Sequence, residues 1–197
     1  ALAPAALADL TPPPQPGFQR FIRREPLGVV LVLAPWNYPY LTAVNSVVPA
    51  LIAGNAIVLK HSDQTPLCAE RLTAAAKMAN LPEGLFAHLH ASHADVAKMV
   101  GDSRVDFVSF TGSVEGGRAV HRASAGRFIA VGLELGGKDP AYVRADADLE
   151  HAVPNLVEGA FYNAGQSCCG IERIYIHRAH WDRFLEAATA IVNDYVL

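Results

Sequence analysis

Two adjacent cysteines, Cys168 and Cys169, are the residues of this chain best suited to nucleophilic chemistry. They follow the run NAGQS (163–167), and the chain has one further cysteine, Cys68. A thiolate is polarisable and adds readily to a carbonyl carbon, so the pair could supply a catalytic nucleophile. Two other interpretations are a metal or redox pair and two small apolar residues in a core. The rest of the sequence has to decide among the three.

The metal or redox interpretation has the least support. Three cysteines are an odd number, and they show neither the C-x-x-C spacing of a metal site nor a disulfide framework. His88, His90 and His93 are the other residues of metal-ligand type that lie close together in sequence. A strand end and a helix cap explain them more simply, so we predict no metal site. The lack of a disulfide framework is typical of a reducing compartment, and we expect a cytoplasmic protein.

Two further side chains have types that could assist a thiol. Glu134 lies between Leu133 and Leu135, and burial among apolar residues would raise the pKa of its carboxyl toward the range of a general base. A lone glutamate at a strand end is more often a solvated surface charge. Asn37, in PWNYP, has an amide that could donate to a developing oxyanion, although asparagine between prolines is also a common turn residue.

A third set of residues has the character of a dinucleotide site. Lys60 ends an apolar run and is followed by Asp63, and both could equally be solvated surface charges. Gly112 and Ser113 precede a predicted helix, and Gly117 lies in its first turns. The free N–H groups of a helix N-terminus attract a pyrophosphate. The chain has no GxGxxG fingerprint.

The elements that would position these residues alternate between strands and helices. Short apolar runs predict strands at 28–34, 56–60, 85–90, 105–110, 128–135 and 173–177. Helix patterns cover 42–54, 65–80, 92–101, 113–125, 148–165 and the segment from 181 onward. This alternation predicts an α/β fold, with a Rossmann-like, mostly parallel sheet covered by helices on both faces. Such sheets bind ligands at the carboxyl ends of their strands, where the candidate residues lie.

Composition excludes several classes of protein. Of the 197 residues 51% are hydrophobic and 18% charged, which is a globular composition. A net charge of −3 and a pI near 6.2 give no indication of a nucleic acid or an anionic membrane as partner. We find neither a run long enough to span a membrane nor a signal peptide. Residues 1–20 are rich in alanine and proline and predict an arm or linker, with ordered structure from about Phe21.

Five motifs, taken in order, make the chain resemble the NAD(P)-dependent aldehyde dehydrogenase superfamily. They are APWNYP, VLK with a following Gln-Thr-Pro, FTGS, LELGGK and GQSC. The resemblance runs from about Phe21 to the last residue. It implies a cofactor-binding domain over 21–135, after the arm at 1–20. Residues 136–197 would then be the first, incomplete part of a second α/β domain that carries the thiol and the catalysis.

The resemblance also assigns roles in catalysis. The nucleophile of the Gly-Gln-x-Cys motif is its fourth residue, Cys168, whereas Cys169 would be a packing residue. Addition of the thiolate to an aldehyde gives a thiohemiacetal, which loses hydride and leaves a thioester. Glu134 would activate the water that cleaves the thioester. Asn37 and the backbone N–H of Cys168 would bind the oxyanion.

The same resemblance places the cofactor. Lys60 is similar to the lysine that binds the adenosine ribose, and Asp63 stands where many members have glutamate. The shorter acid leaves room for a 2′-phosphate, so we expect NAD and keep NADP as an alternative. Gly112, Ser113 and Gly117 would face the pyrophosphate.

Some features around this cofactor site are less typical. Trp36 is also predicted to bind the cofactor, although a role in packing alone would explain it more simply. Two runs depart from the family pattern: KHSD replaces the usual Lys-Pro start, and HLHASHAD replaces a glycine-rich loop near the adenine.

The resemblance implies a small aldehyde as substrate and a homo-oligomer for the full-length protein, but it does not identify the aldehyde. Members are much longer and carry a Glu-x-Phe-Gly-Pro motif that this chain lacks. We therefore expect the chain alone to bind cofactor poorly and to be inactive. Two alternatives stay open. One is a cofactor-independent thiol esterase or hydrolase, with His151 or His177 beside the thiol, and the other is a non-catalytic module on the same fold.

Overall fold

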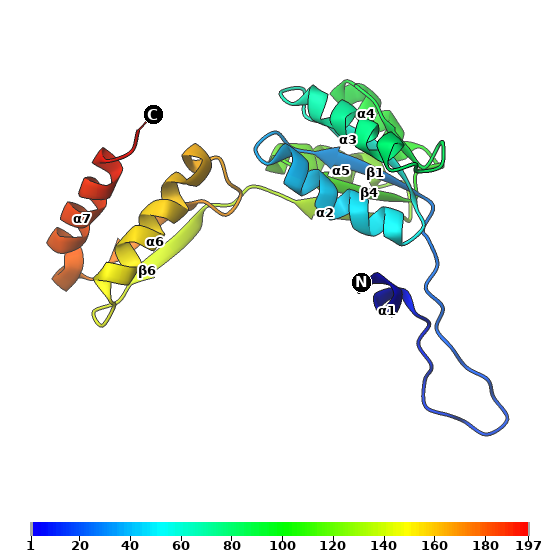
Figure 1. The fold of residues 1–197 in the computed structure, drawn as a ribbon, viewed down its shortest axis with the longest axis horizontal. Coiled ribbons are helices and arrows are strands. Elements are labelled where there is room, and N and C mark those ends of the chain that lie inside the picture. The colour runs from blue at the N-terminus through cyan, green and yellow to red at the C-terminus, as the bar shows by residue number, and fades with distance from the viewer. Residues whose placement is uncertain (1, 197) are drawn as a thin grey trace. The chain divides into compact units, whose positions relative to one another are not determined.

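The chain divides into two compact units, which are described separately. The computed structural model describes residues 2–196. The first unit is Ala1–Glu134 and the second is Leu135–Leu197 (Figure 1). Sequence analysis places the domain boundary after residue 135, and the structure divides the chain after Glu134.

A five-stranded parallel sheet forms the centre of the first unit. Its strands are β1 (Val29–Ala34), β2 (Ala56–His61), β3 (Phe86–His88), β4 (Phe107–Thr111) and β5 (Ala130–Glu134). They lie in the order β3-β2-β1-β4-β5, and each neighbouring pair is parallel. The predicted parallel α/β sheet is therefore confirmed.

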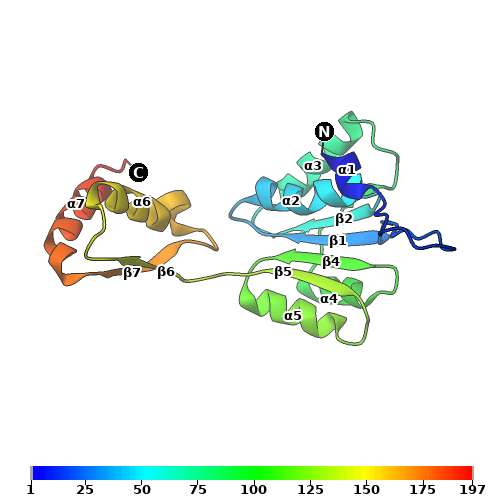
Figure 2. The same ribbon diagram turned by 90° about the horizontal axis from the view of Figure 1, so that it is seen from below.

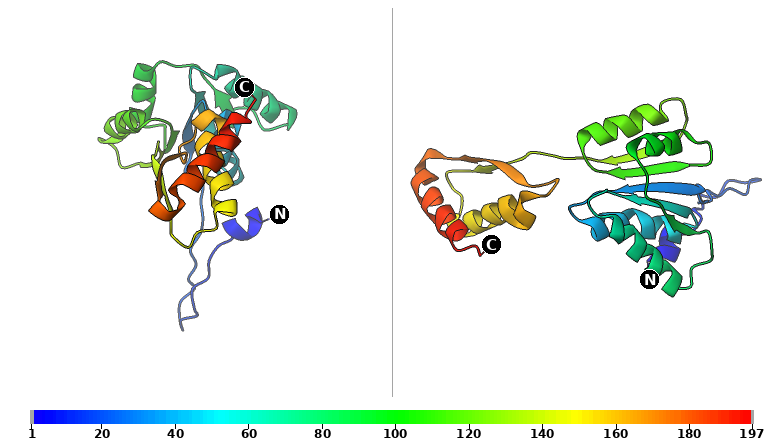
Figure 3. Two further views of the ribbon diagram at one scale, coloured as in Figure 1. Left: turned by 90° about the vertical axis from the view of Figure 1, so that its left-hand side faces the viewer. Right: turned by 90° about the horizontal axis from the view of Figure 1, so that it is seen from above.

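Helices cover both faces of this sheet. Helices α2 (Pro39–Ile52) and α3 (Pro66–Met78) lie on one face, and α4 (His93–Gly101) and α5 (Val114–Ser124) lie on the other (Figures 2 and 3). Successive side chains of β1 point to opposite faces of the sheet. Val30 and Val32 belong to the apolar cluster under α2 and α3. Leu31 and Leu33 belong to the cluster under α4 and α5. A strand buried on both faces needs apolar residues throughout, which explains the continuous run GVVLVLA.

The first unit differs from the prediction at several element ends. The predicted arm contains a short helix, α1 (Ala3–Leu7), and Leu10 forms a bridge with Ile22, so ordered structure begins well before Phe21. Strand β3 is shorter than the predicted 85–90. Helix α3 begins after Thr65 as expected, but the Thr65 hydroxyl makes no capping bond and is buried without a partner among the described residues.

The second unit is smaller and has one two-stranded sheet among the described residues. Strands β6 (Asp139–Val143) and β7 (Ile171–Ile176) pair in parallel, and α6 (Leu149–Phe161) and α7 (Trp181–Asn193) pack with them. Two short 3-10 segments, η1 (Tyr162–Gly165) and η2 (Arg178–His180), follow α6 and β7. Sequence analysis missed β6, because it begins with Asp-Pro, which reads as a turn. The helix predicted over 148–165 ends at Phe161.

The unit's core is a single cluster around Val143, Val153, Val157 and Phe184.

Within residues 2–196, we find no helix with the length and apolar character to cross a membrane.

Candidate functional site

The candidate residues of the first unit gather at one edge of the sheet. All five strands run in the same direction, so their carboxyl ends share that edge. Strands β2 and β3 lie on one side of β1, and β4 and β5 lie on the other, so the strand order reverses between β1 and β4. Ligands of open α/β sheets bind outside the carboxyl ends at such a switch point. The segments after β1 and β4 contain Asn37, Gly112 and Ser113.

The turn after β1 carries Trp36 and Asn37. Pro35 is buried, Asn37 is half-buried, and Trp36 is 39% exposed, so the indole is not part of the core. Helix α2 starts two residues after Asn37. Its first turn is fixed by Thr42, whose backbone N–H and hydroxyl both donate to the Tyr38 carbonyl, at 3.0 and 2.7 Å.

Lys60 and Asp63 form an ion pair at the end of β2. The Lys60 side chain is 8% exposed, and its Nζ lies 2.8 Å from Oδ1 of Asp63, whose side chain is 74% exposed. The hydrogen bond from Lys60, and then its charge, lower the pKa of Asp63, so the carboxylate is ionised at neutral pH. Lysine has three ammonium donors, and Asp63 uses one of them. The pair can therefore offer both donors and a carboxylate acceptor to a sugar hydroxyl.

His61, the next residue, is a site feature that sequence analysis missed. It is 2% exposed, and neither ring nitrogen has a hydrogen-bond partner among the described residues. Burial, and then the charge of Lys60, lower its pKa, so the ring is neutral at pH 7. The only signal in the sequence was a titratable residue directly after an apolar strand, at the point where KHSD departs from the family pattern.

The turn after β4 has the form of an anion-binding helix start. Ser113 is the N-cap of α5, and its Oγ accepts from the Gly116 N–H at 3.1 Å. A Cβ at Gly112 would lie 2.8 Å from Cζ of Phe110, so this turn has no room for a side chain there. Gly117 is buried within α5, and its assignment to the cofactor stays a prediction.

Glu134 is the last residue of β5, beside the same turn. Its carbonyl accepts from the Gly112 N–H at 3.0 Å. The residue is exposed, which contradicts the expected burial among apolar neighbours. The neighbouring leucines do not enclose it because it stands at the final position of the strand, where the sheet ends.

Both cysteines of the second unit lie on an exposed turn after η1. Three successive residues before the turn have left-handed backbone: φ is 51° at Asn163, 56° at Ala164 and 73° at Gly165. Such values are uncommon outside glycine and store strain, which tends to occur at functional sites. Cys168 and Cys169 are both exposed, so the prediction that Cys169 packs in a core is wrong. The Cys169 sulfur lies 3.3 Å from the Ser167 hydroxyl.

The LGGK and GQSC motifs meet in this unit. A Cβ at Gly137 would lie 2.6 Å from the Cys168 carbonyl oxygen, so any side chain there would displace the cysteine turn. The next residue, Lys138, pairs with Glu172 of β7. Gly137, the second glycine of the LELGGK motif, therefore has a steric role against the Cys168 backbone, which the sequence alone did not reveal.

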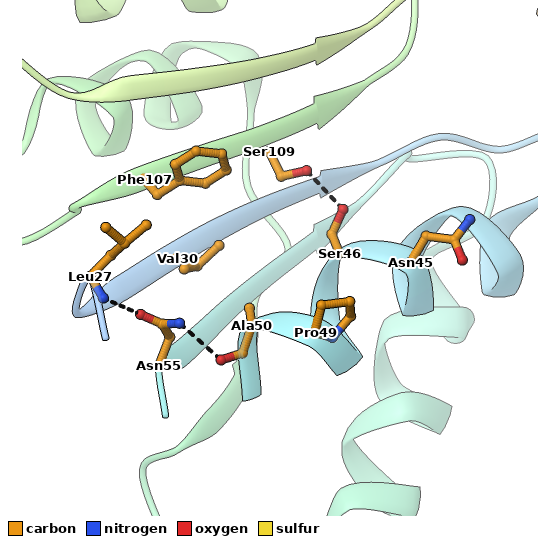
Figure 4. Close-up of a pocket in the computed structure, with 9 residues that line it drawn as sticks. All are labelled: Leu27, Val30, Asn45, Ser46, Pro49, Ala50, Asn55, Phe107 and Ser109. Carbon is orange, nitrogen blue, oxygen red and sulfur yellow. Dashed lines mark hydrogen bonds between the residues drawn. The ribbon is translucent and has the colours of Figure 1, made fainter. Parts of the chain in front are cut away.

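The hollow shown in Figure 4 is separate from these residues. It has a volume of about 370 Å³ and is lined by residues of α2, β1 and β4 together with Leu27 and Asn55. Asn55 accepts from the Leu27 and Gly28 N–H groups and donates to the Ala50 carbonyl, which ties the amino ends of β1 and β2 to the end of α2. The hollow contains none of the predicted site residues.

The fold and site define a doubly wound α/β protein followed by a thiol-bearing unit. The sequence model of the aldehyde dehydrogenase family matches residues 3–196. The match begins well before Phe21, so our estimate of where the resemblance starts was too late. The chain belongs to the aldehyde dehydrogenase family.

Individual relatives agree with this result. The succinate semialdehyde dehydrogenase [NAD(P)+] Sad of Escherichia coli (strain K12) is 38% identical over 177 residues, which are 88% of this chain and 38% of that protein. An aldehyde dehydrogenase from Bacillus cereus, solved as an NAD+ complex, superposes with a TM-score of 0.93 at 33% identity, over 98% of this chain and 40% of that one. Succinic semialdehyde dehydrogenase from Streptococcus pyogenes, solved with NADP+, gives 0.91 at 30% identity, over 98% and 42%. The chain thus spans about two fifths of the length of these relatives.

Proposed function

We propose that this chain takes part in NAD(P)-dependent oxidation of an aldehyde to a carboxylic acid, with Cys168 as nucleophile. The observation that carries the proposal is the family match over 3–196 combined with an exposed thiol at the fourth position of GQSC. The first unit would bind the cofactor, and the second would be the thiol-bearing part of the catalytic domain. A homo-oligomer and a cytoplasmic location stay predictions.

The proposed chemistry starts at the Cys168 sulfur. The thiolate adds to the aldehyde carbon, a C–S bond forms, and the carbonyl oxygen becomes an oxyanion. The Asn37 amide and the Cys168 N–H would donate to that oxygen. The bound nicotinamide supplies the acceptor for the hydride that leaves the substrate carbon. Water then attacks the thioester and loses a proton to Glu134, and breaking the C–S bond releases the acid and the thiolate.

Cys168 is preferred to Cys169 for two reasons in the second unit. The Cys169 sulfur contacts the Ser167 hydroxyl, whereas the Cys168 backbone is held against Gly137. Because Glu134 is exposed, its assignment as the base rests on its place in the LELGGK motif and on the family match.

The residues of the first unit fit a dinucleotide. The N-terminus of α5, capped by Ser113 and preceded by Gly112, suits a pyrophosphate because its free N–H groups attract anions. Lys60 and Asp63 suit the adenosine ribose, and Trp36 has an exposed ring near the switch point. The ionised Asp63 would repel a 2′-phosphate, so we propose NAD as the preferred cofactor and NADP as the weaker one.

A titration of the isotope-labelled chain with NAD+, followed by NMR, tests the cofactor site even if binding is weak. We expect shifts at the turn after β1, at Lys60 to Asp63 and at Gly112 to Ser113. Lys60→Ala should weaken binding by about 1–3 kcal/mol, the range for hydrogen bonds to charged groups. Lys77→Ala, an exposed lysine of α3, is the matched control. Shifts confined to other residues, or equal affinities of the two variants, would remove Lys60 from the site.

The thiol hydrolase alternative lacks a specific observation in its favour. Within the described residues, the His151 ring and carbonyl accept from the Asn155 amide, the His177 ring accepts from the Ala179 N–H, and no hydrogen bond joins either histidine to Cys168. Ester hydrolysis without cofactor, measured beside nicotinamide reduction with an aldehyde, separates the two activities. The expectation that the chain alone does not turn over is checked in the same assay.

A further inference from the structure

A histidine and carboxylate cluster lies between helix α3 and the end of strand β3. One potential ligand atom from each of Glu70, His88 and His90 lies within 4.8 Å of those of the other two. Glu70 comes from α3, His88 is the last residue of β3, and His90 follows two residues later. We propose that these three side chains bind a divalent transition metal of the zinc type. None of the three residues has a role in the proposed catalysis, so the proposal does not rest on the dehydrogenase function.

Thr73 sets the tautomer of His88. The Thr73 hydroxyl donates to the Ala69 carbonyl at 3.0 Å, and its oxygen lies 2.7 Å from Nδ1 of His88. With its single proton directed to Ala69, the Thr73 oxygen accepts from Nδ1–H. The neutral His88 ring then carries its lone pair on Nε2. Metal-binding histidines commonly have this arrangement, with one ring nitrogen held by a second group and the other free for the metal.

The spacing of the other two ligands is close to that of a metal site. Nε2 of His90 lies 3.1 Å from Oε1 of Glu70. In a tetrahedral zinc site with Zn–N and Zn–O distances of about 2.0–2.1 Å, neighbouring ligand atoms are about 3.3 Å apart. The side chains of His90 and Glu70 are 51% and 50% exposed, so they can rotate to close the remaining distance to His88. Their exposure also leaves a position for water as fourth ligand.

The donor set selects the kind of metal. Two imidazole nitrogens and one carboxylate oxygen suit zinc, nickel or copper, whereas magnesium and calcium prefer oxygen ligands alone. Sequence analysis treated His88 and His90 as satisfied residues of a strand end. Their hydrogen bonds to Thr73 and Glu70 agree with that view, but one nitrogen of each ring also lies within 4.8 Å of a Glu70 carboxylate oxygen. Because the ligands come from α3 and from the end of β3, a bound ion would tie the helix to this edge strand.

The test is calorimetric titration of the tag-free chain with Zn²⁺. Its cysteines are first blocked with iodoacetamide, because the exposed Cys168 and Cys169 would bind zinc themselves. We expect one zinc per chain and a raised thermal midpoint, since an ion that binds only the folded state stabilises it. Glu70→Gln and His90→Ala change half-exposed side chains and should each lower the affinity by about tenfold or more. His93→Ala and His121→Ala, exposed histidines outside the cluster, should leave it unchanged.

A fifth variant separates a metal site from incidental surface binding. Thr73→Val keeps the shape of the side chain but removes the group that holds His88, and it should lower zinc affinity by about tenfold or more. The same stoichiometry and affinity in Glu70→Gln, His90→Ala and the two control variants would overturn the proposal. So would the absence of zinc binding by the blocked chain while it remains folded.

Discussion

The two units bury their sheets in different ways. In the first unit, five of the six residues of β1 are buried, and helices cover both faces. In the second, Val143, Ile174 and Ile176 face the cluster with α6 and α7, whereas Tyr142 and Tyr175, which are register partners, are 67% and 54% exposed. Two apolar clusters, one on each face, thus stabilise the first sheet and the strand ends that carry the candidate cofactor residues. A single cluster stabilises the second sheet and the turn that carries the cysteines. The second unit should accordingly depend more on each core residue.

The largest expected effect is therefore in the second unit. Phe184→Ala removes a ring that is 4% exposed, at an expected cost of about 3–5 kcal/mol in the free energy of unfolding of this unit. Each unit contains one tryptophan, so Trp181 reports on this transition when Trp36 is replaced by phenylalanine. Denaturant unfolding followed by fluorescence measures the change. Leu185→Ala, at a half-exposed position, is the control and should cost far less.

A change of similar kind in the first unit should be the next largest. Leu31 is fully buried under α4 and α5, and Leu31→Ala should cost about 2–5 kcal/mol. Trp36, with Trp181 replaced by phenylalanine, reports on this unit. Because two clusters support the sheet, we expect a folded unit to persist in the variant. If Leu31→Ala unfolded the first unit completely while the second unit stayed folded in Phe184→Ala, the first unit would be the one that depends more on each core residue.

The cysteines of the two units should also differ in how fast they are alkylated. Cys168 and Cys169 are exposed, whereas Cys68 of α3 is half-buried and hydrogen-bonded to Tyr40, a contact that raises the pKa of the tyrosine. Limited alkylation with iodoacetamide, mapped by mass spectrometry, should modify Cys168 first, then Cys169, and Cys68 last. Cys169→Ala should leave the fast phase, and Cys168→Ala should remove it. A fast phase that maps to Cys169 would transfer the nucleophile assignment to that residue.

The smallest expected effect is the pH dependence that His61 gives the first unit. Burial and the Lys60 charge lower the pKa of His61 below the ordinary value of about 6.5, and the nearby Pro35 backbone partly opposes them. As pH falls below about 6.5, the unfolded chain binds a proton at this position and the folded chain does not, so stability falls. His61→Leu should flatten this part of the stability profile, measured by unfolding at several pH values. An unchanged profile would mean that His61 binds its proton equally in both states.

The strands that were clearest in the sequence are those buried on both faces, although the shorter or half-exposed β3, β5 and β7 were also predicted. β1, β2 and β4 read as apolar runs because both sheet faces need apolar side chains. β6 could not be found in this way, since it is half-exposed and starts with Asp139 and Pro140. Helix α1 was missed because an Ala/Pro-rich segment has the composition of an extended arm.

The candidate site shows a similar limit. The motifs identified the residues at the strand ends, and the parallel topology places Asn37, Lys60 and Ser113 along one edge. The exposure of Glu134 and Cys169 and the burial of the His61 ring depend on neighbours that are distant in sequence. Local sequence pattern carries no information on such contacts.

The close approach of Gly137 to the Cys168 carbonyl has a consequence for the stage of folding at which the cysteine turn forms. The two residues flank the pairing of β6 with β7, which begins at Asp139 and Ile171. That pairing is non-local, so the chain must first close a loop that includes all of α6. Newly made or refolding chains should therefore form the Cys168 turn only when β6 and β7 pair. A pulse of alkylating agent at successive times of refolding would record the assembly of the second unit as a change in the alkylation rate of Cys168.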